Sequence, residues 1–311
     1  NLECIYHLPE RISGDWFCTV IHMTELSFAK GVKAIIQILE LLGSAKSTNQ
    51  ISNTGATTAE DKISTCLEEV SRSIKDMKYS LSRMRDHLDA RSFFDIIRPF
   101  LDGWGGDKSP LPEGLIYEGV SDIPVKLTGG SGAQSTTLQV LDSLLGVEHT
   151  ADKRIFLTEM RNYMLPSHRR FVEDIEQYPY PLRQFVISSS NEALKSSYNR
   201  CLSTLQELRD YHIKIVKMYV VIPSRKANES INKSLDERGT GGSNLIPFLR
   251  DICFATEEKK LHTVEPAATT VLRSRWNVLE PTIRFCGTVM LLAVAGFATS
   301  SVISLLQAQK I

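Results

Sequence analysis

The chain has 311 residues, of which 42% are hydrophobic and 23% are charged. This globular composition excludes collagen-like, disulfide-scaffold and disordered proteins. Because 36 Lys and Arg residues balance 36 Asp and Glu residues, there is no basic field to attract phosphates, and we expect no nucleic-acid partner. The six cysteines are far apart, mostly beside apolar residues, and form no C-x-x-C pair. This pattern indicates reduced core thiols of an intracellular protein rather than disulfides or a zinc site.

The start of the chain carries no sign of a targeting segment. It begins with Asn1 instead of methionine, and the first residues contain neither a basic region nor a long apolar run. A secretory signal needs both features. We therefore expect no secretory signal, and we expect the chain to be the C-terminal part of a longer protein.

Apolar residues in the body of the chain have mostly helical spacing. They recur every three or four positions from Val32 to Leu42 and from Leu67 to Met84, whereas strand-like alternation is scarce. The sequence therefore predicts a mainly α fold. Clusters of Gly, Ser, Thr, Asn and Pro predict breaks between helices at residues 43–60, 103–114, 129–134 and 223–244. We expect the first and last of these segments to be long polar loops.

Two glycine-rich segments, residues 129–135 and 239–242, are candidate ligand-binding turns. The first lacks the Gly-Lys-Ser/Thr end of a phosphate loop, and it lacks the second glycine and the preceding strand of a nucleophile elbow. What remains is a turn before an expected helix at residues 138–145, whose free backbone N–H groups can receive a carboxylate. Two such turns could wrap a small anionic ligand, although each alone is more often a simple helix entry.

His212 differs from the other histidines in its helical context. It lies four residues after Leu208 and three before Ile215, on the apolar stripe of an amphipathic helix. An imidazole there is either an axial iron ligand or a core histidine bonded to backbone, and the spacing alone leaves both open. We expect the remaining histidines to lie at the surface or in the core with their hydrogen bonds satisfied; they are His7, His22, His87, His149, His168 and His262.

The C-terminal region contains a long apolar run. Residues 285–306 are 22 residues without a charge, between Arg284 and Lys310, and as a helix they would extend roughly 33 Å, the thickness of a bilayer core. We predict a single-pass tail anchor, with a buried C-terminal helix as the alternative. Arg273, Arg275 and Arg284 precede the run, which favours a cytosolic position for the preceding chain.

Seven segments resemble the indoleamine 2,3-dioxygenase family, in the order in which that family has them. They are residues 92–104 (SFFDIIRPFLDGW), 115–119 (LIYEG), 129–135 (GGSGAQS), 142–146 (DSLLG), 161–171 (RNYMLPSHRRF), 208–212 (LRDYH) and 239–242 (GTGG). The resemblance covers roughly residues 16–259 and implies a large helical haem domain from which most of the small N-terminal domain is missing. The domains it implies are a remnant or linker at 1–15, the haem domain at 16–262, a linker at 263–284 and the candidate transmembrane helix at 285–306.

The resemblance assigns a cofactor and the residues around it. In this family one histidine holds the iron of haem b, and the matching residue is His212. The resemblance also implies that Arg209 and Asp142 lie at the haem edge and its proximal side, and that Gly130 belongs to the cofactor site. A guanidinium can pair with a propionate through two bonds. From the residues alone, Arg209 and Asp142 could instead be a surface ion pair.

The substrate site is also implied by the resemblance. The family binds the tryptophan carboxylate through an arginine, matched by Arg98, and Phe93 and Phe94 beside it would form a wall for the indole. Thr240 of the second glycine turn would meet the amino-acid end of the substrate, and Ser131 would lie near haem and substrate.

A further indole contact depends on the alignment of the first helix. Phe17 matches another aromatic residue of the family when Glu25 and Lys33 are aligned with it. The same alignment places Ile21 where the family often has a small polar residue, and a slip of one residue would place His22 there instead.

The implied activity is insertion of both atoms of O2 into the indole C2–C3 bond of L-tryptophan or another indoleamine. The product is N-formylkynurenine, at the first step of the kynurenine pathway, and the reaction needs no general acid or base from the protein. We expect a cytoplasmic monomer, with membrane attachment through the tail. Two alternatives stay open: an O2-binding or sensing haem protein like the molluscan myoglobins that resemble this family, and a helical protein without haem.

Overall fold

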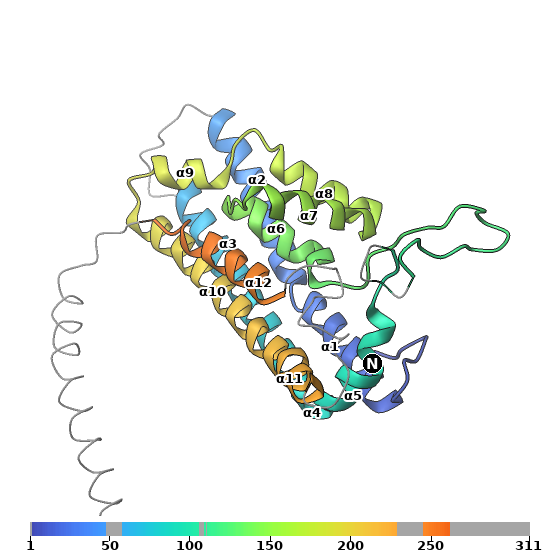
Figure 1. The fold of residues 1–311 in the computed structure, drawn as a ribbon. Helices are drawn as coiled ribbons and strands as arrows, with labels where there is room; N and C mark the ends of the chain where they lie inside the picture. The colour runs from blue at the N-terminus through green and yellow to red at the C-terminus, as the bar shows by residue number, and fades with distance from the viewer. Residues whose placement is uncertain (1, 48–57, 106–108, 110, 229–244, 262–311) are drawn as a thin grey trace, which may run out of the picture. The chain divides into compact units, whose positions relative to one another are not determined.

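Long amphipathic helices form the frame of the molecule (Figure 1). The computed structural model describes residues 2–47, 58–105, 109, 111–228 and 245–261. One compact unit comprises Asn1–Leu261. In the described ranges there is no β-strand, and only two isolated antiparallel bridges occur, Trp104 with Leu127 and Leu115 with Val125. The prediction of a mainly α fold is confirmed.

The elements follow one another along the chain, with a long connection between η2 and η3. They are α1 (Arg11–Leu26), α2 (Ala29–Ser47), α3 (Ala59–Ser82), α4 (Met84–His87), α5 (Ala90–Ser92), η1 (Phe93–Ile97), η2 (Arg98–Leu101), η3 (Gly132–Gln134), α6 (Thr136–Leu145), α7 (Ala151–Met160), η4 (Arg161–Tyr163), α8 (Pro166–Glu176), α9 (Leu182–Ser188), α10 (Glu192–Val216), η5 (Lys217–Val221), α11 (Ile222–Asn228) and α12 (Leu245–Glu257).

The centre of the molecule is the contact between α3 and α10, the two longest helices among the described residues (Figure 1). Arg200 donates to Glu68 across this contact at 2.7 Å. Further along both helices, Lys78 donates to Glu207 at 2.8 Å. Because the pairing advances in the same direction on both helices, α3 and α10 run parallel. Their facing stripes are fully buried, among them Leu67, Val70, Ile74, Tyr198, Leu202 and Leu205.

A wider turn of π-helix precedes Arg98. Its backbone N–H bonds to Phe93 O, five residues back, instead of four. Pro99 follows directly, and a proline has no N–H to donate. The change of hydrogen-bond register at η1 and η2 therefore accommodates Pro99 and sets the direction in which the Arg98 side chain leaves the backbone.

The same device occurs after α10. The N–H of Ile222 bonds to Lys217 O, five residues back, and Pro223 follows. The helical path then continues as α11 to Asn228. The expected loop at residues 223–244 was therefore wrong at its start, because the wider turn at η5 accommodates Pro223 without ending the helical path.

Gly43 likewise does not end a helix, contrary to the loop expected from this residue onward. α2 continues to Ser47, and a Cβ at Gly43 would lie 3.0 Å from the hydroxyl of Tyr178. That hydroxyl donates to Leu39 O at 2.5 Å. Gly43 thus makes room for a tertiary contact inside the helix, which local sequence could not reveal.

The cysteines were expected in the core, and this holds for Cys201 and Cys253 alone among the described residues. Burial raises the pKa of Cys201 to about 12 and that of Cys253 to about 11, so both thiols are inert. Cys4, Cys18 and Cys66 are partly exposed. The sixth cysteine lies outside the described residues.

Candidate functional site

A cavity of about 270 Å³ lies between α10, the glycine turn at residues 129–135 and α12. Helices α1, α3, α4, α6 and α7 and the turns η1, η2 and η5 also contribute to its wall. Most lining side chains are apolar. The polar and charged side chains in the lining are Arg98, Ser131, Gln139, Asp142, Arg209, His212 and Tyr219.

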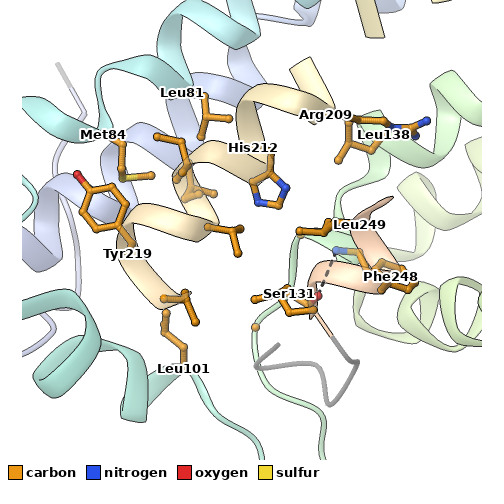
Figure 2. A pocket seen from close by; sticks show the side chains of 18 of the residues that line it. Leu81, Met84, Leu101, Ser131, Leu138, Arg209, His212, Tyr219, Phe248 and Leu249 are labelled. Carbon is orange, nitrogen blue, oxygen red and sulfur yellow. Dashed lines mark hydrogen bonds between the residues drawn. The ribbon is translucent and has the colours of Figure 1, made fainter. Parts of the chain in front are cut away.

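His212 projects from α10 into this cavity (Figure 2). Leu208, one turn before it, is buried, and Ile215, one turn after it, also lines the cavity. The expectation that His212 lies on the inward stripe is confirmed. Burial lowers the pKa of its imidazole, so the neutral ring, which is the form that binds metals, predominates at pH 7. The glycine turn lies opposite, since a Cβ at Gly132 would be 3.9 Å from His212 Cε1.

Arg209 stands beside His212 on α10 and anchors a buried network. Its Nη2 donates to Asp142 Oδ1 on α6 at 2.6 Å, and its Nη1 donates to the Thr256 hydroxyl on α12. His149 Nε2 lies 2.9 Å from Asp142 Oδ2. The four residues therefore tie three helices and the segment after α6 together along one side of the cavity.

This network is not a surface ion pair. Asp142 is 8% exposed and Arg209 7%, so that alternative for the two residues was wrong. Burial alone would raise the pKa of the Asp142 carboxyl, but Arg209 and His149 outweigh it and hold the pKa below its usual value. Asp142 is thus an anion at neutral pH. His149 is a satisfied core histidine, and nothing in its sequence context distinguished it from an exposed one.

Arg98 is the second arginine of the lining. It is 4% exposed at the start of η2, and its guanidinium lies 5.7 Å from the centroid of the Phe94 ring. Burial lowers its pKa and the charge of Asp102 opposes this shift, but a guanidinium stays protonated at any physiological pH. Phe94 is fully buried and is not among the lining residues. Its position suits support of Arg98 and does not suit contact with a ligand.

An aromatic cluster closes one end of the cavity. The ring centroids of Phe17 and Phe93 are 5.1 Å apart, and those of Phe93 and Tyr219 are 5.8 Å apart. All three side chains line the cavity. Ile21 lines it as well, whereas His22 is exposed and bonds to Cys18 O at 2.8 Å. Of the two residues that the alternative alignments offer, Ile21 lines the cavity and His22 is not among the described lining residues.

Side-chain hydrogen bonds within the glycine turn link its residues to one another. Gln134 Nε2 donates to Gly129 O at 3.0 Å, and the Ser131 hydroxyl accepts from Ala133 N at 3.2 Å. Gly130 and Ser131 both line the cavity (Figure 2). The expected helix entry is confirmed, since Ser135 caps α6 by accepting from Leu138 N at 3.3 Å.

Several lining residues had no functional prediction. Leu245, Phe248, Leu249 and Ile252 come from α12, and Figure 2 draws Phe248 and Leu249 among the side chains that line the cavity. Their helical apolar spacing was the only available signal. Thr240, the second glycine turn and the candidate span at residues 285–306 lie outside the described residues. Among the residues that the structure describes, no helix combines the length and the apolarity needed to cross a bilayer.

The chemistry of the lining fits a haem group. The cavity offers one neutral imidazole, His212, in walls that are otherwise mostly apolar. Haem needs such an axial nitrogen, an apolar surround for the macrocycle and cations for its propionates. Arg209 and Arg98 are the cations in the lining. Asp142 offsets the charge of Arg209 and so reduces the free-energy cost of burying its guanidinium, with or without bound haem.

Comparison with known proteins agrees with this chemistry. The model of the indoleamine 2,3-dioxygenase family matches residues 1–259. The chain is 38% identical over 258 residues to a myoglobin of Haliotis diversicolor, covering 83% of this chain and 64% of that protein. It is 37% identical to human indoleamine 2,3-dioxygenase 2 and 36% identical to mouse indoleamine 2,3-dioxygenase 1, each over 269 residues, 84% of this chain and 62% of the relative. The chain thus spans about 62–64% of the length of these relatives. It belongs to the indoleamine 2,3-dioxygenase family.

Proposed function

We propose that the chain is the haem-binding part of a dioxygenase that cleaves the indole C2–C3 bond of L-tryptophan, or of another indoleamine, with O2 to give N-formylkynurenine. One observation supports this most: His212, Arg209 and Arg98 line the same apolar cavity. They offer a neutral imidazole for iron and two guanidinium groups for carboxylates. The human and mouse relatives carry the name of this activity.

On the cofactor side, His212 would hold the iron and Arg209 would pair with a propionate. Haem b, when bound, supplies the O2 chemistry. Asp142 fixes the orientation of Arg209 by accepting its Nη2 hydrogen at 2.6 Å, and Gly130 would contribute a wall without a side chain. The protein's task on this side is retention and orientation of the cofactor.

On the substrate side, Arg98 would bind the carboxylate of tryptophan. Phe17 and Phe93 line the cavity near it and would stack against the indole, while Phe94 would hold the guanidinium from behind. Ser131 lies in the turn that faces the cavity, and Thr240 would meet the amino-acid end of the substrate. No side chain is needed as a general base, because the residues bind, orient and exclude water.

The test is turnover by the purified full-length chain loaded with haem. The absorbance spectrum gives the haem content, and anaerobic and aerobic incubations with L-tryptophan give the O2-dependent yield of N-formylkynurenine. We expect near-stoichiometric haem and product formation that requires O2. A protein that binds haem and O2 but forms no product would refute the dioxygenase assignment.

A second candidate is an O2-binding haem protein on the same scaffold. The similarity to the Haliotis myoglobins is the observation that favours it. An O2 carrier has no need for carboxylate recognition, so Arg98 in the cavity supports the enzyme instead. The two functions separate in a titration with L-tryptophan, which should perturb the haem spectrum of the enzyme and leave that of a carrier unchanged.

We also propose that the chain is a monomer whose catalytic part faces the cytosol, with residues 285–306 as a membrane anchor. The support is the absence of charge in that run and the three arginines before it.

A further inference from the structure

Two cysteine side chains meet where the N-terminal segment crosses the start of α1. Cys4 Sγ lies 3.6 Å from Asp15 O, one turn before Cys18 on that helix. Asp15 and Cys18, three residues apart, lie on the same face of α1, and the Cys4 thiol is close enough to raise the pKa of Cys18. A second contact holds the segment in place, because His7 Nδ1 lies 2.8 Å from Asp15 Oδ1.

Both thiols are partly exposed, unlike Cys201 and Cys253. Thiol exchange requires access to sulfur as well as a thiolate. Burial raises the pKa of Cys18, and the neighbouring Cys4 and Asp15 raise it further. Cys18 is therefore a slow first attacker at neutral pH, but a sulfur held against its partner can complete a second, intramolecular step.

We propose that Cys4 and Cys18 form a dithiol that a low-molecular-weight disulfide, such as glutathione disulfide, converts into an intramolecular disulfide. In the first step the thiolate of one cysteine attacks a sulfur of the reagent, and one glutathione thiolate leaves. In the second step the other cysteine loses its proton and attacks the protein sulfur of the mixed disulfide, and the second glutathione thiolate leaves. Two protein thiols are oxidised, one glutathione disulfide is reduced to two thiols, and the protons go to solvent or to the leaving thiolates.

The position of the pair gives the reaction a structural consequence. Cys18 follows Phe17 on α1, and Phe17 and Ile21 of this helix line the cavity. The disulfide would fasten the segment before α1 to the helix that carries them. We therefore expect the oxidised protein to resist proteolysis within residues 4–10 more than the reduced protein does. This inference does not rest on the proposed function.

The experiment uses the full-length protein as purified, treated with glutathione disulfide and mapped by mass spectrometry without reduction. We expect a peptide pair linked through Cys4 and Cys18, whose mass is lower by two hydrogens than the summed masses of the two reduced peptides. Cys66, whose Sγ lies 3.6 Å from Gln37 Oε1, is the matched, partly exposed control, and we expect a glutathione adduct there.

Two variants and one denatured sample complete the test. Cys4→Ser should remove the linkage and leave Cys18 reduced or glutathionylated, whereas Cys66→Ser should leave the linkage unchanged. Protein treated in urea should give mixed pairings, because the fold no longer selects one. The inference is overturned if Cys4 and Cys18 stay reduced or carry separate adducts while Cys66 reacts, or if the native and denatured samples give the same distribution of pairs.

Discussion

His212 offers the cavity an uncharged nitrogen, because burial lowers the pKa of its imidazole. We predict that His212→Ala abolishes stable haem binding and leaves the helical content intact, since the side chain faces a cavity and contributes little packing. The measurement is the Soret band per mole of protein, together with circular dichroism. His22→Ala is the matched control, because His22 is exposed on α1 and its loss should change neither signal. A His212 variant with near-stoichiometric haem and an unchanged ferric spectrum would move the axial ligand elsewhere.

Arg98 should matter for the substrate and little for the cofactor. A buried carboxylate that loses its guanidinium partner loses about 2–5 kcal/mol. We therefore expect Arg98→Leu to keep haem and O2 binding while most tryptophan turnover disappears. Indole has no carboxylate, so any binding of indole should be nearly the same in both proteins. Turnover of tryptophan within about twofold of the unmodified protein would remove Arg98 from the substrate site.

His149 tests the buried network at its outer end. His149→Ala leaves Asp142 Oδ2 without the contact that His149 makes at 2.9 Å, and an unsatisfied buried acceptor costs about 1–3 kcal/mol. We expect a lower free energy of unfolding and faster haem loss, whereas His149→Gln should restore much of both because its amide can donate to the carboxylate. Equal behaviour of the two variants would show that the bond to Asp142 contributes nothing.

The pH dependence of this network follows from the lowered pKa of Asp142. A carboxyl whose folded pKa lies below its unfolded value stabilises the fold above the unfolded pKa and loses that contribution as pH falls toward the folded one. The unfolding free energy should therefore decrease on acidification below about pH 4. Asp142→Asn should flatten this part of the profile.

At the scale of elements, α10 bears His212, which faces the cavity, and α10 is held in place by its contact with α3. Leu205 is fully buried in this contact, and removing a buried leucine side chain costs about 2–5 kcal/mol. We expect Leu205→Ala to lower the free energy of unfolding in urea by about that amount. Glu207→Ala on the same helix is the control, because its 2.8 Å ion pair with Lys78 is exposed and is worth about 0–1 kcal/mol. Similar decreases in the free energy of unfolding in both variants would show that the buried apolar side chains are not the main source of stability in this contact.

Helical spacing predicted the helices. Local sequence did not predict features that depend on contacts between residues far apart in the chain. The stripe that places Leu208, His212 and Ile215 on one face of α10 was readable because helical periodicity is a local property. Gly43 stays inside α2 because Tyr178, which is far away in sequence, needs the space. His149 could not be predicted, since its partner Asp142 meets it only through the turn at the end of α6.

Most of the candidate site came from the resemblance, and the structure adds what motifs omit. The motif segments contain the arginines and the histidine, but the wall from α12 and the π-helical turn η5 lie outside them. A family role assigned to Phe93 does not automatically apply to its neighbour Phe94, because adjacent residues on a helical turn point in different directions. Phe93 enters the cavity, while Phe94 packs under Arg98.

At the scale of the whole molecule, the described residues that line the cavity fall between Phe17 and Ile252, within the compact unit Asn1–Leu261. The charge-free run at residues 285–306 is thus separate in sequence from these lining residues. We predict that removal of all residues from Glu280 onward leaves the haem spectrum unchanged and releases the protein from the membrane pellet. Arg273 and Arg275 remain in this truncation, so basic residues alone should not retain it.

Carbonate extraction of the full-length protein followed by immunoblotting measures the attachment. A full-length protein that stays in the supernatant, or a truncation that loses haem, would instead identify the run as a core helix packed on the haem domain.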